Sequence, residues 1–335
     1  MSRMPEGTVI EAPRLWRWIV RAVATSLALV ALALASLYAY AGTYGFNVLF
    51  RRGLWINVTV APDDARLSAP MRLALREPSG AVTAGPLAWR GIATGFEVGE
   101  LAVLADGSEV DRILLARIDP THFRFAVRNA PAGNRDLEAW MRELGAALVI
   151  NGSYFSRDGT PDTPIVSAGA RLGPRRYIAN HGAFVASSRS VGVRDFGSLD
   201  WHIALRGVEN AMISYPLLVA RDGTSRVKGD PRWLANRSFV AEDHDGRIIL
   251  GTTAEAFFSL PRLAAFLRES PLDLAVALNL DGGPVACQGI ALNGYRRSAC
   301  GRWELSARNG RLDLLTPVFG TARWSLPIVL AVFPR

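Results

Sequence analysis

Three polar residues follow or flank apolar runs that are typical of buried strands, and their side chains could do chemistry. Asp281 comes after the mostly apolar residues 274–280 and is followed by Gly282 and Gly283. Because two glycines leave space beside it, its carboxylate could project into a cleft and bind a ligand or exchange a proton there. The same pattern is also typical of a simple turn that ends a strand.

Arg237 and Asn151 could act beside such a carboxylate. The planar guanidinium of Arg237 can hold two oxygens of a phosphate group, whereas a lysine offers only a point charge. Asn151 follows the apolar residues 146–150 and can both donate and accept hydrogen bonds, for example with sugar hydroxyls. The structural alternatives are a surface arginine on a hairpin and an ordinary Asn-Gly turn.

The sequence lacks the motifs of several common enzyme classes. It contains no H-E-x-x-H, no G-x-G-x-x-G, no G-x-x-x-x-G-K-[ST] and no G-x-S-x-G. Its four histidines are far apart, and two cysteines cannot build a cysteine-rich zinc cluster. The sequence therefore predicts no cofactor and no metal site made of neighbouring residues, and it leaves open whether a divalent metal takes part.

The net charge raises the question of nucleic-acid binding. The formal charge is +8 and the isoelectric point is about 10.1. Half of that excess lies in residues 1–52, and residues 53–335 carry 32 basic and 28 acidic groups. Because phosphate neutralisation requires clustered basic residues, we expect no nucleic-acid partner.

An apolar segment near the N-terminus predicts a membrane anchor. Residues 22–50 contain no charged residue, and residues 22–41 are mostly apolar, which is about the length that crosses a hydrocarbon core as a helix. Four arginines precede the segment and two follow it, so the positive-inside tendency places residues 1–21 in the cytoplasm, the span at residues 22–45, and the rest outside. A signal peptide cleaved near Ala41 is the alternative. In either case an oxidising compartment would allow Cys287 and Cys300 to form a disulfide, although two reduced buried thiols are the other possibility.

The pattern of apolar residues predicts the elements that position these groups. We expect strands at residues 54–60 and 71–76, an extended pair at 112–118 and 122–127, and buried strands at 146–150 and 274–280. A helix should run from a cap at Asn134 to Gly145, and a second should begin near Ser259. The predicted fold is therefore α+β: mixed β-sheets with a few flanking helices, preceded by one N-terminal transmembrane helix. Residues 53–109 form a β-rich lead-in and residues 110–335 the main domain.

Four segments, taken in order, resemble the phosphodiester glycosidase family. Residues 147–155 read A-L-V-I-N-G-S-Y-F, similar to the family's strand followed by N-G-G-[FY]-F. Residues 214–219 read S-Y-P-L-L-V, similar to its S-G-P-x-L-V strand, and Asn236-Arg237-Ser238 resembles its R-[TS] or R-N element. Residues 277–283 read A-L-N-L-D-G-G, the family's loop after a strand. The resemblance covers about residues 110–335.

The resemblance implies an exported, membrane-tethered glycosidase that hydrolyses a sugar-1-phosphodiester or a related cell-envelope glycan. Its partners would be a carbohydrate or sugar-phosphate substrate and, through residues 22–45, the inner (cytoplasmic) membrane. The implied catalytic residues are Asp281, Arg237 and Asn151. The implied substrate contacts are Gly152, Tyr154, His181, Ser214, Gly282 and Gly283. A second carboxylate could come from Asp158, Asp162, Glu242 or Glu255.

The sequence departs from the family pattern at three positions. Ser153 and Tyr215 stand where the family has glycine, and Pro284 stands where it usually has glycine or serine. Added side chains near a substrate-binding loop favour a second hypothesis, in which the protein is a catalytically inactive glycan-binding or envelope-scaffold protein.

Overall fold

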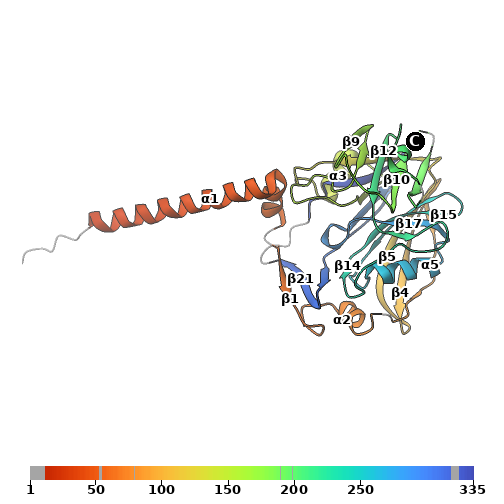
Figure 1. Ribbon diagram of the computed structural model, residues 1–335, viewed down its shortest axis with the longest axis horizontal. Helices are drawn as coiled ribbons and strands as arrows, with labels where there is room; N and C mark the ends of the chain where they lie inside the picture. The colour runs from red at the N-terminus through yellow and green to blue at the C-terminus, as the bar shows by residue number, and fades with distance from the viewer. Residues whose placement is uncertain (1–11, 53–54, 79, 189, 198, 318–323) are drawn as a thin grey trace, which may run out of the picture.

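The structure is a computed structural model that describes residues 12–52, 55–78, 80–188, 190–197, 199–317 and 324–335. Within these residues the chain forms twenty-two β-strands, five α-helices and one short 3-10 helix. The strands lie in four sheets within one body, from which helix α1 projects (Figure 1). The predicted fold class, β-sheets with few helices behind an apolar N-terminal helix, is confirmed.

Helix α1 (Ala12–Arg52) bends at Gly42, whose φ of 57° lies outside the helical range. Its segment Trp16–Leu49 is long and apolar enough to cross a membrane, judged by length and composition, and contains the predicted span at residues 22–45. Leu27 and Leu32 are 65% and 64% exposed, so the body of the protein does not cover this apolar surface. Of the residues predicted to be cytoplasmic, 1–11 lie outside the described residues.

Beyond the bend, α1 packs against the body of the protein. Ala41, Tyr44 and Val48 are buried there, and the ring of Tyr44 meets that of Phe155 edge to face at 5.5 Å between centroids. The Asn47 side chain donates a hydrogen bond to the carbonyl of Ala132 at 2.6 Å. The C-terminal end of helix α1 is therefore in contact with the segment that carries Tyr154.

An eight-stranded sheet forms the centre of the body. Its strands are β13 (Leu217–Val219), β17 (Leu274–Asn279), β15 (Ser238–Asp243), β16 (Ile248–Thr253), β5 (Ser108–Ile118), β4 (Phe96–Ala105) and β2 (Thr83–Ala84), with β3 (Arg90–Ala93) beside β4. Both faces are buried: along β17, Val276 and Leu278 pack into one apolar core and Ala277 into another. Helix α5 (Leu260–Glu269), capped by Ser259 as predicted, covers the second face.

A five-stranded sheet carries the first predicted motif. Its strands, in order, are β19 (Tyr295–Cys300), β18 (Cys287–Leu292), β7 (Leu148–Asn151), β22 (Ile328–Pro334) and β6 (Phe123–Asn129). Helix α3 (Leu137–Leu144) packs on it and ends at Gly145 as predicted, but its N-cap is Asp136 rather than Asn134, because the Asp136 carboxylate accepts from the Ala139 amide at 2.9 Å. Cys287 and Cys300 face each other on neighbouring strands and form the disulfide.

Two smaller sheets complete the body. One contains β11 (Val191–Asp195), β10 (Gly182–Ala186), β12 (Asn210–Ser214), β8 (Ile165–Ser167) and β9 (Ala170–Leu172), with helix α4 (Trp201–Ala204) nearby. The other contains β1 (Trp55–Thr59), β21 (Arg311–Pro317), β20 (Glu304–Arg308) and β14 (Leu234–Ala235). The 3-10 helix η1 (Gly283–Val285) follows the Asp281 loop.

Two local predictions are wrong. Residues 71–76 belong to helix α2 (Ala69–Arg76), not to a strand, because Ser68 caps the helix and a proline stands in its first turn. Strands β5 and β6 exist but do not pair with each other: β5 lies between β4 and β16, and β6 pairs with β22. The division between residues 53–109 and 110–335 stays a prediction, and β4 and β5 pair across it.

Candidate active site

One cavity gathers several of the predicted site residues. It has a volume of about 300 Å³, and six stretches of chain that are separated in sequence contribute to it. Its lining is Tyr154, Tyr215, Lys228, Gly229, Asp230, Trp233, Ala235, Arg237, Leu260, Pro261, Asp281, Gly282, Gly283 and Glu304. Asp281 and Arg237, both predicted from sequence motifs, therefore face the same space.

The Asp281 loop is fixed by hydrogen bonds along its backbone. The Asp281 amide donates to the carbonyl of Gly152 at 3.0 Å, and the Gly282 amide donates to the Asp281 carboxylate at 2.8 Å. The side-chain amide of Asn151 donates to the Asp281 carbonyl at 2.7 Å. This loop therefore depends on β7 and its following residues for its position.

Asn151 and Gly152 lie behind the cavity rather than on its lining. Asn151 is buried, and while its Nδ2 contacts the Asp281 carbonyl, its Oδ1 accepts from the Cys287 amide at 3.0 Å. Both ends of this side chain are thus bonded to the backbone. At Gly152 a Cβ atom would lie 2.5 Å from a methyl carbon of Ile328, so this glycine allows close packing against β22.

Arg237 is a buried cation with only part of its hydrogen-bonding capacity in use. Its Nε donates to the Phe258 carbonyl at 3.1 Å, and its Nη2 donates to the Trp233 carbonyl at 2.9 Å. Burial lowers the pKa of its guanidinium, and the nearby Tyr154, Glu304 and Asp281 oppose that effect. No carboxylate in the described part of the chain lies within ion-pairing distance of Arg237. Its remaining N–H donors are therefore available to an oxyanion.

Glu304 is a second carboxylate that sequence analysis missed. It begins β20, and the pairing of β20 with β14 places it opposite Ala235, two residues before Arg237. Burial raises the pKa of Glu304, whereas Arg237 and a hydrogen bond from the Trp233 side chain lower it. Gly283 has a φ of 67°, and a Cβ there would lie 2.7 Å from a carboxylate oxygen of Glu304. No motif in the sequence marks Glu304 as a site residue.

The two carboxyl groups raise the proton affinity of the site. Burial is the largest effect on Asp281 and, together with the charges of Glu304 and Asp162, raises its pKa to about 8, against the opposing effects of the Gly282 amide and Arg237. Asp281 is therefore mostly protonated at pH 7 and able to donate a proton. Two carboxyl groups and one buried cation form the chemical centre of the cavity.

Two stacked tyrosines form one wall. The rings of Tyr154 and Tyr215 lie 4.3 Å apart between centroids with 25° between their planes. The Tyr154 hydroxyl donates to the Tyr215 carbonyl at 2.7 Å and accepts from the Asn279 side chain at 2.7 Å. Burial raises the pKa of Tyr154, which keeps its phenol protonated. Tyr215 remains 39% exposed, and its ring is available to the face of a sugar.

The structure does not place His181 or Ser214 on the cavity lining. The Leu217 amide donates to Nδ1 of His181 at 3.2 Å, and burial, together with Arg226, lowers the pKa of this imidazole. The His181 ring lies 6.2 Å from that of Tyr215, at the edge of the site. Ser214 is fully buried in β12, where it pairs with Gly182.

The other suggested carboxylates differ in position. Among the four, Asp162 is the residue whose charge raises the pKa of both Asp281 and Tyr215. Asp158 accepts hydrogen bonds from Ser156 and Thr160 in its own turn. Glu242 bonds to the Val193 amide and to Arg221. None of these four residues lines the cavity.

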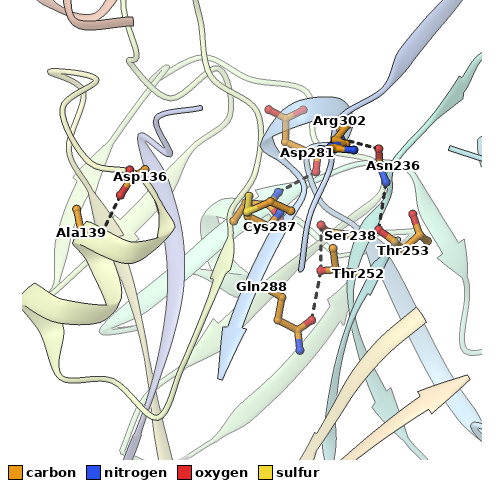
Figure 2. The surroundings of a disulfide bond; sticks show 12 residues. Asp136, Ala139, Asn236, Ser238, Thr252, Thr253, Asp281, Cys287, Gln288 and Arg302 are labelled. Carbon is orange, nitrogen blue, oxygen red and sulfur yellow. Dashed lines mark hydrogen bonds between the residues drawn. A yellow bond between two sulfur atoms is a disulfide. The ribbon is translucent and has the colours of Figure 1, made fainter. Parts of the chain in front are cut away.

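The disulfide and the side chain of Asn236 lie close to the Asp281 loop. Figure 2 shows Cys287 beside the loop of Asp281, with Asn236 bonded on one side to Thr253 and on the other to Arg302. The Asn236 Oδ1 accepts from the Arg302 and Trp303 amides at 2.9 and 3.0 Å, which fixes the segment leading to Glu304. Among the described residues, no group of three or more His, Cys, Asp or Glu could hold a metal ion.

Comparison with known proteins supports the resemblance. Residues 144–288 match the model of the phosphodiester glycosidase family, which confirms the predicted resemblance over that segment. The structure is similar to the catalytic domain of zebrafish N-acetylglucosamine-1-phosphodiester alpha-N-acetylglucosaminidase, auto-inhibited by its pro-peptide, with a TM-score of 0.50 and 16% identity over 84% of this chain and 88% of that one. A hypothetical protein from Synechocystis has a TM-score of 0.48 and 16% identity over 75% of this chain and 64% of that one. No curated protein matches. At these identities the structural likeness concerns the fold.

Proposed function

We propose that this protein is a phosphodiester glycosidase that hydrolyses a sugar-1-phosphodiester of the cell envelope. The observation that carries the proposal is the meeting of Asp281, Glu304 and Arg237 in one cavity. The family match over residues 144–288 supports the same reaction class. Asn151, 130 residues from Asp281 in sequence, acts in this account as a positioning residue for the catalytic loop.

In the proposed reaction, Arg237 binds the phosphate and Asp281 acts as the acid. Water attacks the anomeric carbon while the bond from that carbon to the bridging oxygen breaks. The electron pair goes to the bridging oxygen, which takes the proton of Asp281, and Glu304 receives the proton of the water. The products are a free sugar and a phosphate monoester. Because a phosphate leaves readily as an anion, the binding of its charge by Arg237 is as important as the proton.

The wall formed by Tyr154 and Tyr215 suits the sugar. Aromatic rings pack against the apolar face of a pyranose, and Trp233, Leu260 and Pro261 add apolar surface on the same cavity. Gly282 and Gly283 keep the space beside Arg237 and Glu304 open. His181 and Ser214 do not line the cavity, and neither contacts the substrate directly in this account.

The test is the release of sugar by the detergent-solubilised full chain. A panel of sugar-1-phosphodiesters with different sugars and different groups on the phosphate would be incubated with the protein at pH 6 to 8. Free sugar and phosphate monoester would both be quantified, and hydrolysis should release them in equal amounts. We expect turnover on at least one member. A folded protein that binds members of the panel and releases no sugar would contradict the proposal.

An inactive glycan-binding protein is the second candidate, and Tyr215 is the observation that favours it. Of the three departures from the family pattern, only Tyr215 lines the cavity; Ser153 is buried beside Thr163, and Pro284 is buried in η1. Replacement of Tyr215 by glycine would distinguish the two candidates. Glycan binding without turnover in both the wild type and Tyr215→Gly would favour the second.

We also propose that α1 tethers the domain to the inner membrane, with residues 53–335 outside the cytoplasm. The exposed apolar surface of Trp16–Leu49 supports a membrane environment, and cleavage near Ala41 remains the alternative route of export. Treatment of intact spheroplasts with protease distinguishes these outcomes. We expect the domain to be digested from outside and the α1 fragment to stay with the membrane; a domain that is protected would contradict the export.

A further inference from the structure

A second cavity lies at the opposite end of strands β10 and β12 from the candidate active site. It has a volume of about 460 Å³ and lies between β6 and the ends of these strands, at Ala186 and Asn210. Tyr215 follows the other end of β12, which places the two cavities about 14 Å apart along a five-residue strand. The small side chains of Ala126, Ala168 and Gly169 on its lining leave space for the cavity.

Three arginines gather at this second cavity, which we call the arginine cavity. Arg124 and Arg128 stand four residues apart on β6, so they share one face of the strand, with Ala126 between them. The guanidinium carbon of Arg124 lies 4.1 Å from the ring centroid of Phe333. The Nε of Arg335 donates to the Pro120 carbonyl at 3.1 Å, which holds this side chain beside the start of β6. Each guanidinium is positioned by contacts that leave N–H donors unused.

No carboxylate side chain forms an ion pair with any of these three arginines in the described part of the chain, in contrast to several arginines elsewhere on the body. Arg112, Arg117 and Arg297 each form an ion pair with a glutamate. In the described ranges, no Asp or Glu side chain lies within 4 Å of the guanidinium of Arg124, Arg128 or Arg335.

One lining carboxylate and one amide balance part of this charge. Glu209 is the single acidic residue of the described lining, and it accepts a hydrogen bond from the Ser188 amide at 3.3 Å. The Nη1 of Arg128 makes only a long contact of 3.5 Å with Asn210 Oδ1 and a bond of 3.0 Å to the Val127 carbonyl. Burial and the charge of Arg124 both lower the pKa of Arg128, as expected for like charges held together. An anion would relieve this repulsion.

We propose that the arginine cavity binds a phosphate group, separately from the candidate active site. Two guanidinium forks can each hold two oxygens of one phosphate, and the volume also admits an attached sugar. The phosphate could belong to a free sugar phosphate or to a second unit of a phosphate-linked glycan. Arg335 lines the cavity, and the C-terminus lies on the body away from the projecting part of α1 (Figure 1).

The test is calorimetric titration of the detergent-solubilised full chain with inorganic phosphate and with glucose 1-phosphate. The double variant Arg124→Gln/Arg128→Gln is compared with Arg142→Gln, which removes an exposed arginine of α3. We expect the double variant to lose one binding site or to bind at least tenfold more weakly at that site, while the control matches the wild type. Equal affinity and stoichiometry in the wild type and the double variant, an equal loss in the control, or no binding of either ligand by the wild type would overturn the proposal.

Two further measurements separate loss of binding from unfolding and identify the source of the phosphate. The single variants and thermal melts without phosphate show whether a loss of binding comes from unfolding; a single variant that melts like the wild type and binds more weakly supports the site. A soluble phosphate-linked oligosaccharide then distinguishes the sources: tighter binding than glucose 1-phosphate assigns the site to a polymer, and equal binding assigns it to the free sugar phosphate. None of these measurements depends on turnover, so the proposal stands or falls independently of the glycosidase activity.

Discussion

The candidate active site and the arginine cavity place the same side chain, arginine, in opposite surroundings. Arg237 is buried, Asp281 and Glu304 beside it are partly buried, and desolvation shifts the pKa of all three groups. Arg124 is exposed and Arg128 half-buried; Glu209 lines the same cavity, but neither arginine forms an ion pair among the described residues. Buried charges of opposite sign alter proton affinities, which is what acid-base chemistry needs. Partly exposed charges of one sign provide attraction for an anion and little else.

The largest expected effect comes from removing the acid. Asp281→Asn keeps the shape of the loop but cannot donate a carboxyl proton, so kcat for sugar release should fall about 10²–10⁴-fold. The matched control is Asp106→Asn, at an exposed turn with a φ of 48°. If kcat falls by less than about threefold in Asp281→Asn, Asp281 is not the acid, and the candidate site would resemble the arginine cavity in lacking acid-base chemistry.

Glu304→Gln tests whether the two carboxyl groups act on each other. We expect kcat to fall about 10²-fold, because the base is lost. Since the charge of Glu304 raises the pKa of Asp281, its removal should also move the alkaline decline of the remaining activity from near pH 8 to a lower pH. Glu269→Gln, an exposed glutamate at the end of α5, is the control. An unchanged alkaline limb would show that the carboxyl groups are not coupled.

Arg237→Lys tests the role of the planar cation. A lysine keeps the positive charge but loses the bonds to the Phe258 and Trp233 carbonyls and the paired donors for phosphate. We expect kcat/KM to fall roughly 10–100-fold, mainly through KM, with Arg142→Lys as the control. If KM is unchanged and only the melting temperature falls, Arg237 is a structural cation and does not bind substrate.

Salt should separate the two cavities by a smaller effect. Because mobile ions screen exposed charges more than buried ones, raising sodium chloride from 50 to 500 mM should weaken phosphate binding at the arginine cavity several-fold more than it raises KM at the candidate site. Titration calorimetry and initial-rate kinetics at the two salt concentrations measure this. Equal salt dependence would place both sites in similar surroundings.

Sequence reasoning located the centre of the site but not its full membership. Asp281 was predicted because it follows a strand and precedes two glycines in the A-L-N-L-D-G-G segment, and Arg237 because Asn236-Arg237-Ser238 resembles an element of the family. Glu304 was not, since only the pairing of β14 with β20 brings it opposite Ala235, and no local pattern announces that pairing. Asn151 has the composition of a ligand-binding residue, but its bonds to the Asp281 carbonyl and Cys287 amide are visible only in three dimensions.

In the fold as well, elements set by local sequence patterns could be predicted, whereas pairings between distant segments could not. The hairpin of β15 and β16, helix α5 and strand β17 follow from turn residues, a serine cap and continuous apolar runs. Helix α2 was misread because M-R-L-A-L-R at residues 71–76 alternates like a strand, while the cap at Ser68 and Met71, Ala74 and Leu75 on one buried face decide for a helix. The partners of β5 and β6 are distant in sequence, so their pairing was beyond local patterns.

The central claim is that Asp281 is held protonated in the cavity, and its titration tests this most directly. Infrared difference spectra of the wild type minus Asp281→Asn, recorded from pH 4 to 10, isolate the carbonyl stretch of one protonated carboxyl group. The account predicts that this band persists at pH 7 and disappears with a midpoint near pH 8. A midpoint below pH 5 would show an ordinary ionised aspartate and would contradict the assignment of Asp281 as the acid.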